Sequence, residues 1–172
     1  DSFNMDLLEK LNKNIAIIYR NYTKPHVEEE IFKINKFCNK IGKRFYLSND
    51  IKLVDKLNLK GIYIPSFNKT LDVLKLKKKK IHILGSAHNL KEILQKQKQK
   101  IDIIFISPIF KIKKKNTNLS ISKFKTLANH ANQKVVALGG INIKNIKKIK
   151  MLDCYGYASI SYINNTYNNY KA

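Results

Sequence analysis

The chain alternates between short runs of β-branched residues and longer segments in which apolar residues recur at helical spacing. Runs that are apolar almost throughout are typical of strands covered on both faces, as in parallel sheets. Seven such runs occur, at residues 15–20, 44–47, 61–64, 81–85, 103–107, 135–139 and 156–160.

The segments between the runs predict amphipathic helices. Residues 27–41 place Ile31, Ile34 and Cys38 on one apolar stripe, and Gly42 follows at a position where left-handed backbone ends a helix. Similar patterns predict helices at residues 5–11, 51–57, 89–99, 122–131 and 143–151, and Asn142 is the expected N-cap of the last.

Repeated strand–helix units predict a parallel sheet with right-handed crossovers. We therefore expect an α/β fold, a TIM (β/α)8-type barrel, over one domain that spans residues 1–172. A barrel has eight strands, so the first is expected either upstream of residue 1 or lost. An open doubly wound sheet is the alternative, and no Gly-x-Gly-x-x-Gly motif follows the first run to support it.

The formal net charge of +22 changes the expected partners. The excess is carried by lysine, since Arg20 and Arg44 are the only arginines, and heavy use of Ile and Asn indicates a codon bias towards A and T. The field favours phosphorylated small molecules. Nucleic acid is the less favoured partner, and we expect no membrane partner because no apolar stretch reaches about 18 residues. The oligomeric state stays open, a homo-oligomer included.

Two further features indicate a cytoplasmic location. Cys38 and Cys154 lack metal-ligand spacing and are expected to be reduced thiols. Residues 1–4 do not resemble the start of a signal peptide.

Candidate chemistry follows from the ends of the runs, because barrel active sites lie at the carboxyl ends of strands. Gly139 and Gly140 end the sixth run ahead of a predicted helix, so their backbone N–H groups could cradle a phosphate. Ser161, after the last run, could complete this cup. A simple tight turn at the glycines is the alternative.

Two earlier runs end in polar residues. Arg20 could hold a diphosphate through its forked guanidinium group. Asn49 and Asp50 follow the second run, where a carboxylate could bind Mg²⁺ or a pyrimidine amine, or serve only as a helix N-cap.

Two other connections offer ligand contacts. His88 lies in a small polar turn and either contacts a ligand or is a helix-cap or surface residue. Residues 107–118 form the longest connection at this face, a candidate lid, in which Lys115 either reaches anionic oxygens or belongs to a solvated lysine run. His82 is expected to be packed within a strand, and His26 and His130 are expected at the surface.

The order and spacing of these pieces resemble the thiamine phosphate synthase and TenI superfamily, over residues 15–163. The matching segments are Ser48-Asn49-Asp50, Gly61-Ile62-Tyr63-Ile64, Gly85-Ser86-Ala87-His88, Ser107-Pro108-Ile109-Phe110, Ala137-Leu138-Gly139-Gly140-Ile141 and Ala158-Ser159-Ile160-Ser161. The resemblance implies that a thiazole nitrogen attacks the methylene group of hydroxymethylpyrimidine diphosphate and that Mg²⁺-bound pyrophosphate leaves.

The resemblance also implies a role for each site position. Arg20 and Asn49 would hold the diphosphate or the pyrimidine, and Asp50 would bind Mg²⁺. The other implied contacts are Ser86 and Lys115 to pyrophosphate, and Gly140 and Ser161 to the thiazole phosphate.

Departures from the family pattern fall mainly on the diphosphate half of the site. The first strand lacks the usual Gln and Lys around Arg20, the Gly-Gln pair becomes Pro65-Ser66, and the second Mg²⁺ aspartate becomes Asn68. The alternative is therefore a TenI-like thiazole phosphate tautomerase, in which His88 would transfer a proton. A non-catalytic binder of phosphorylated ligands or nucleic acid is the third hypothesis.

Overall fold

A single parallel sheet organises the computed structural model, which describes residues 5–112, 118–160 and 162–163. Within these residues, the sheet has seven strands in the order in which they occur along the chain. The strands are β1 Ile17–Tyr19, β2 Phe45–Ser48, β3 Gly61–Ile64, β4 His82–Ala87, β5 Ile103–Ile106, β6 Lys134–Leu138 and β7 Gly156–Ala158. Each predicted run therefore forms a strand.

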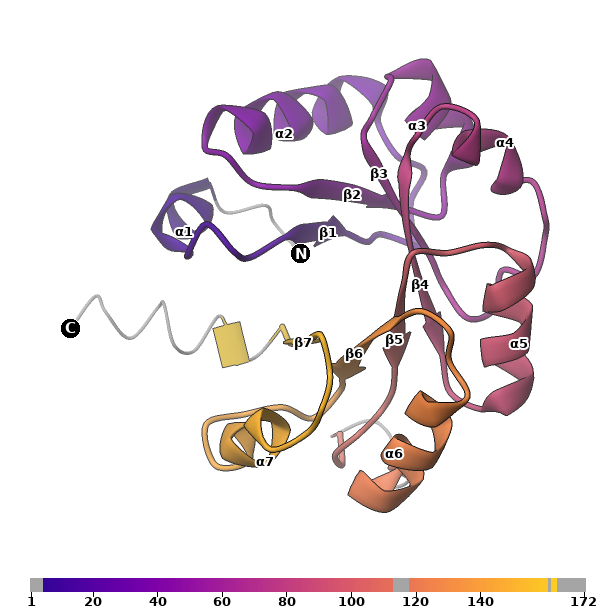
Figure 1. The fold of residues 1–172 in the computed structure, drawn as a ribbon. Helices are drawn as coiled ribbons and strands as arrows, with labels where there is room; N and C mark the ends of the chain where they lie inside the picture. Colours follow the sequence, from indigo (N-terminus) through magenta and orange to yellow (C-terminus); the bar gives the residue numbers. More distant parts are fainter. Residues whose placement is uncertain (1–4, 113–117, 161, 164–172) are drawn as a thin grey trace.

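The helices lie outside the curved sheet (Figure 1). They are α1 Met5–Lys10, α2 Glu28–Lys40, α3 Ile51–Lys56, α4 Leu74–Lys77, α5 Leu90–Lys98, α6 Ser120–Asn129 and α7 Ile146–Lys150. Gly42 has φ +69°, as expected for the residue that ends α2. One local prediction is wrong, since Asn145, not Asn142, precedes α7. Helix α4 was not predicted.

The strand order excludes the doubly wound alternative, because that fold requires a reversal of strand order near the middle of the sheet. Each strand pairs in parallel with its sequence neighbour, from Ile17 opposite Phe45 to Leu138 opposite Ala158. Among the described residues, β1 and β7 are the two edges of the sheet, and Figure 1 shows an opening between them. The described part is thus a curled half-barrel, and a closed eight-stranded barrel stays a prediction.

Both faces of the sheet are buried along the central strands β2 to β5, whereas the edge strands β1 and β7 are only partly covered. The larger core fills the space between sheet and helices and includes Ile31, Leu47 and Ile104. A smaller core on the concave face is built around Tyr63 and Phe105, whose rings meet edge to face at 5.7 Å. Coverage on both sides explains why these strands are apolar along most of their length.

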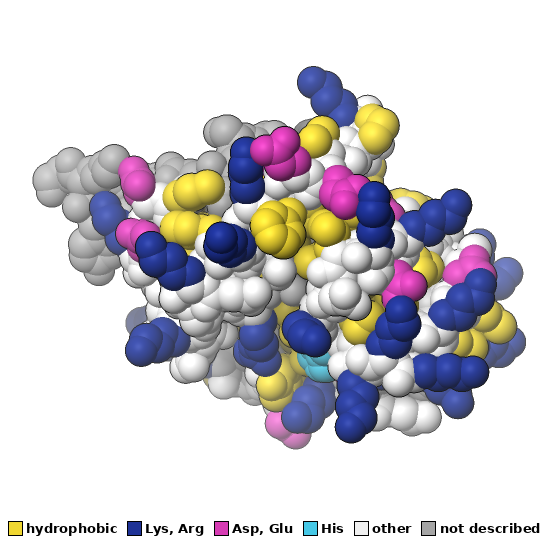
Figure 2. Space-filling view, turned by 90° about the horizontal axis from the view of Figure 1, so that it is seen from above, with side chains coloured by type: hydrophobic (Ala, Val, Ile, Leu, Met, Phe, Trp, Pro, Cys, Tyr) yellow, Lys and Arg dark blue, Asp and Glu magenta, His cyan; other side chains and the backbone are white. Residues whose placement is uncertain are grey.

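Among the described residues, no helix has the length and hydropathy needed to cross a membrane. Lysine and arginine side chains are spread over the face in Figure 2 and are interspersed with hydrophobic and acidic ones. This face therefore does not present one continuous basic stripe.

Candidate functional site at the carboxyl ends of the strands

All seven strands are parallel, so their carboxyl ends meet at one end of the half-barrel, here called the rim. The rim carries most of the residues predicted for the site: Arg20, Asn49, Asp50, Ser86, His88, Gly139 and Gly140. Two predicted residues, Lys115 and Ser161, lie outside the described residues.

The diglycine turn after β6 requires glycine at both positions. Gly139 and Gly140 have φ +96° and +70°, which favour residues without a side chain. A Cβ atom on Gly140 would lie 2.6 Å from the carbonyl oxygens of Phe110 and Lys111, and one on Gly139 would lie 2.8 Å from Pro108. The turn therefore packs directly against the segment that follows β5.

The same turn adjoins the end of β7. The Ser159 hydroxyl donates to the Ile141 carbonyl at 3.2 Å and also accepts from the Tyr162 N–H. Within the described residues, no hydrogen bond is recorded for the N–H groups of Gly140 and Ile141. The backbone donors expected of an anion cup thus lie beside the end of β7, where the Ser159 hydroxyl proton is already used to hold the turn.

Asp50 is the N-cap of α3, which was one of its two predicted roles. Its Oδ1 accepts from the Leu53 N–H at 2.9 Å, and its Oδ2 lies 3.2 Å from His26 Nδ1. The prediction that His26 lies at the surface is wrong, since its side chain is 8% exposed and its Nε2 has no hydrogen-bond partner among the described residues.

Asn49 contacts the loop that follows β3. Its Oδ1 accepts from Asn68 Nδ2 at 2.7 Å, so Asn49, predicted to hold the diphosphate or the pyrimidine, lies beside the residue that replaces the second Mg²⁺ aspartate of the family pattern. Buried Lys96 holds this loop from beneath by donating at 2.8 Å to the carbonyls of Pro65 and Asn68. Burial lowers the pKa of Lys96 to about 8. The sequence did not predict that Lys96 is buried, because the residues around it follow the same helical pattern as those around solvent-exposed lysines.

Arg20 joins an aromatic and hydroxyl cluster that the sequence did not reveal. Its guanidinium lies 5.7 Å from the ring centre of Tyr22, whose hydroxyl is 2.8 Å from Ser48 Oγ. Burial raises the pKa of Tyr63, and hydrogen bonds with Ser86 and Arg20 partly offset this effect. Arg20 and Ser86, predicted separately, are thus linked through the Tyr63 hydroxyl.

His88 is held by the neighbouring strand end. Its Nδ1 lies 2.8 Å from the Ser107 carbonyl oxygen, which can only accept, so Nδ1 carries the proton and Nε2 is left as the basic nitrogen. Its backbone N–H donates to Glu92, and Asn89 caps α5 by accepting from the Glu92 N–H. The helix start therefore fixes the position of this ring.

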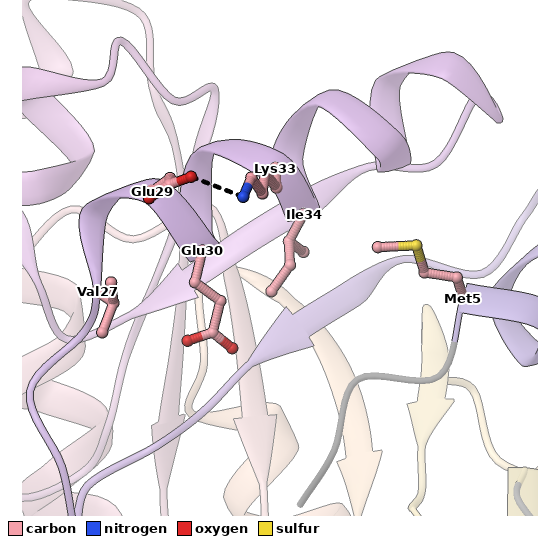
Figure 3. A pocket seen from close by; sticks show the side chains of 6 residues that line it. All are labelled: Met5, Val27, Glu29, Glu30, Lys33 and Ile34. Atoms are coloured by element: carbon pink, nitrogen blue, oxygen red, sulfur yellow. Dashed lines mark ion pairs between the residues drawn. The ribbon is translucent and has the colours of Figure 1, made fainter.

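A groove of about 320 Å³ lies beside α2. It is bordered by Met5 of α1 and by residues 27–34 at and near the start of α2 (Figure 3). Its polar side chains include the exposed ion pair of Glu29 and Lys33. No residue predicted for the site lines it.

The family model described as thiamine monophosphate synthase matches residues 6–163. The chain belongs to this family. It is 30% identical over 156 residues to the thiamine-phosphate synthase of Prochlorococcus marinus, a match that covers 85% of this chain and 44% of that protein. It is also 30% identical over 146 residues to the thiamine-phosphate synthase of Clostridium tetani, covering 73% of this chain and 70% of the relative.

A solved structure shares the fold. The thiamine phosphate pyrophosphorylase of Pyrococcus furiosus superposes with a TM-score of 0.71 at 19% identity, over 91% of this chain and 77% of that protein. Family membership confirms the predicted resemblance. The chain spans less than half the length of the Prochlorococcus relative.

Proposed function

We propose that this member of the family is a thiamine phosphate synthase, which couples hydroxymethylpyrimidine diphosphate to thiazole phosphate and releases pyrophosphate. The observation that carries the proposal is the contact between the diglycine turn and the end of β7, where Ser159 meets Ile141. Relatives that match most of this chain are named thiamine-phosphate synthases.

The reaction forms one bond and breaks another. The thiazole nitrogen donates its electron pair to the pyrimidine methylene carbon, and the carbon–oxygen bond electrons leave with pyrophosphate. Backbone N–H groups of Gly140 and Ile141 would bind the thiazole phosphate. Arg20, beside Tyr63 and Ser86, would stabilise the charge that develops on the leaving pyrophosphate.

Mg²⁺ is implied by the family, and the donors present allow only a partial shell. Among the described residues there is no group of three or more His, Cys, Asp or Glu side chains that could hold an ion. Asp50 supplies one carboxylate, already shared with His26 and the Leu53 N–H. Magnesium is often held by one carboxylate together with substrate phosphates, and such a site fits. The ion would neutralise pyrophosphate charge as that group leaves.

His88 supports a second candidate function, thiazole phosphate tautomerisation. Its protonated Nδ1 is fixed on Ser107, which leaves a basic Nε2 for proton transfer. This reaction would use the same phosphate cup but would not need the diphosphate half of the site. A His88→Ala variant that retains full tautomerase activity would exclude it.

Thermal stabilisation separates these functions. For the synthase we expect thiazole phosphate and Mg²⁺ with pyrophosphate each to raise the melting temperature, and their effects to combine. Asp50→Asn keeps an N-cap side chain, so its unliganded melting temperature should stay close to wild type while stabilisation by Mg²⁺–pyrophosphate falls. Stabilisation by thiazole phosphate alone would favour the tautomerase. Stabilisation by neither, with salt-sensitive RNA binding, would favour the third hypothesis.

A further inference from the structure

A second cavity lies at the opposite end of the half-barrel from the rim. It is open to solvent and has a volume of about 440 Å³. It is lined by residues at the amino ends of the strands, among them Arg44, His82, Asp102, Gln133, Lys134 and Tyr155. None of these residues belongs to the rim site. This space is here called the basal cavity, and its volume is in the range of small-molecule sites.

The charge of the basal cavity is positive. Arg44 and Lys134 have no carboxylate within ion-pair distance among the described residues. The one lining carboxylate, Asp102, is already engaged: Lys77 donates to Oδ1 at 2.5 Å, and the Ile83 N–H donates to Oδ2 at 2.7 Å. The two free cations are therefore not offset by the acid.

The pKa of His82 is affected by its burial and by the positive charge of the cavity. Burial is the main cause that lowers its pKa, and Lys77, Arg44 and Lys134 lower it further against the opposing effect of Asp102. The neutral ring meets the Tyr46 hydroxyl at 2.8 Å through Nδ1. An anion bound in the cavity would raise the pKa of His82, which makes this ring a local reporter.

The other lining residues suit a ligand that is larger than a simple inorganic anion. The Lys134 ammonium lies 4.7 Å from the ring centre of Tyr155, which is 55% exposed and offers a flat surface. The buried Oε1 of Gln133 has no hydrogen-bond partner among the described residues, and such an acceptor calls for a donor. A hydroxyl or amino group of a ligand would supply one once the Gln133 side chain turns toward the cavity, because in the structure this oxygen is shielded from solvent.

We propose that the basal cavity binds a small phosphorylated molecule bearing hydroxyl groups. Its phosphate would pair with Arg44 and Lys134, its body would lie on Tyr155, and a hydroxyl would donate to Gln133. This site is separate from the rim and independent of the function proposed for it.

The test titrates the protein with ribose 5-phosphate and with inorganic phosphate, following the His82 imidazole resonances by NMR. We expect saturable shifts with both probes, and ribose 5-phosphate should bind more tightly. Arg44→Gln with Lys134→Gln should weaken ribose 5-phosphate binding at least tenfold. Gln133→Leu should weaken binding of ribose 5-phosphate but leave that of phosphate unchanged.

The matched control removes the same two charges elsewhere. Lys36→Gln with Lys40→Gln on α2 replaces exposed lysines outside the cavity and should change the affinity less than twofold. A rim variant, Gly140→Ala, should leave the His82 shifts intact even if the rim site is lost. Equal weakening by both double variants, or no saturable shift of His82, would overturn the proposal.

Discussion

At the scale of single residues, glycine is needed at the rim for two reasons that can be measured separately. Gly140 and Gly42 share nearly the same left-handed φ, at +70° and +69°. An added Cβ would meet two carbonyl oxygens at Gly140 and nothing within 4 Å at Gly42. The sequence indicated a functional glycine pair, but the close approach of residues 110–111 came only from the tertiary structure.

Gly140→Ala should therefore destabilise the protein more than Gly42→Ala. We expect about 1 kcal/mol for Gly42→Ala from the left-handed backbone alone and about 3 kcal/mol for Gly140→Ala, where the carbonyl contacts add to it. Urea unfolding of both variants provides the measurement. Equal losses would show that residues 110–111 can move away without cost.

The lowered pKa of Lys96 should make the free energy of unfolding depend on pH. Its folded pKa of about 8 lies below the ordinary 10.5, so from about pH 8 to 10.5 the unfolded chain binds more protons and stability rises with pH. Below about pH 8 the lysine is charged in both states, and the cost of burying it is present in full.

Lys96→Met should remove this rise. At pH 7 the carbonyls of Pro65 and Asn68 lose their donor, but the cost of burying the charge is also removed, so the slope of stability with pH, rather than its level at pH 7, is the test. Melting temperatures between pH 7 and 9 for wild type, Lys96→Met and the exposed control Lys98→Met give the comparison. A wild-type slope parallel to that of Lys96→Met would contradict the assignment.

At the scale of elements, the strands could be predicted because the sheet is buried on both faces along its centre, which leaves nearly unbroken apolar runs. The first residue of each helix was harder to predict, because several nearby asparagines could each serve as the N-cap. Asn89 caps α5 as the pattern indicated, whereas Asn142 accepts from Lys144 in a turn and α7 begins only after Asn145. α4 was missed because four helical residues leave no periodicity to detect.

Asn89→Ala should cost about 1 kcal/mol through loss of the N-cap of α5. Asn142→Ala is the comparison, because Asn142 was predicted to be an N-cap but does not cap a helix in the structure. It should lower the free energy of unfolding by less than half as much. Chemical denaturation of both variants tests the difference. A larger loss in Asn142→Ala would mean that the turn, rather than the cap, matters more.

At the scale of the whole molecule, the parallel order of the sheet brings distant residues to one rim, and this part of the site followed from the sequence. The pairings within the rim did not. His26 with Asp50, Tyr63 with Ser86 and Arg20, and Ser159 with Ile141 join residues that come from different strand ends. Their contacts depend on the curvature of the sheet, and no local pattern encodes it.

We expect the rim to perform the proposed synthase chemistry despite its altered diphosphate half. The most direct measurement is the formation of thiamine phosphate and pyrophosphate from hydroxymethylpyrimidine diphosphate, thiazole phosphate and Mg²⁺, with Gly140→Ala in parallel. We predict both products in equal amounts with the wild type and a rate at least tenfold lower in Gly140→Ala. No thiamine phosphate at saturating concentrations of both substrates, from protein that still binds thiazole phosphate, would contradict this expectation.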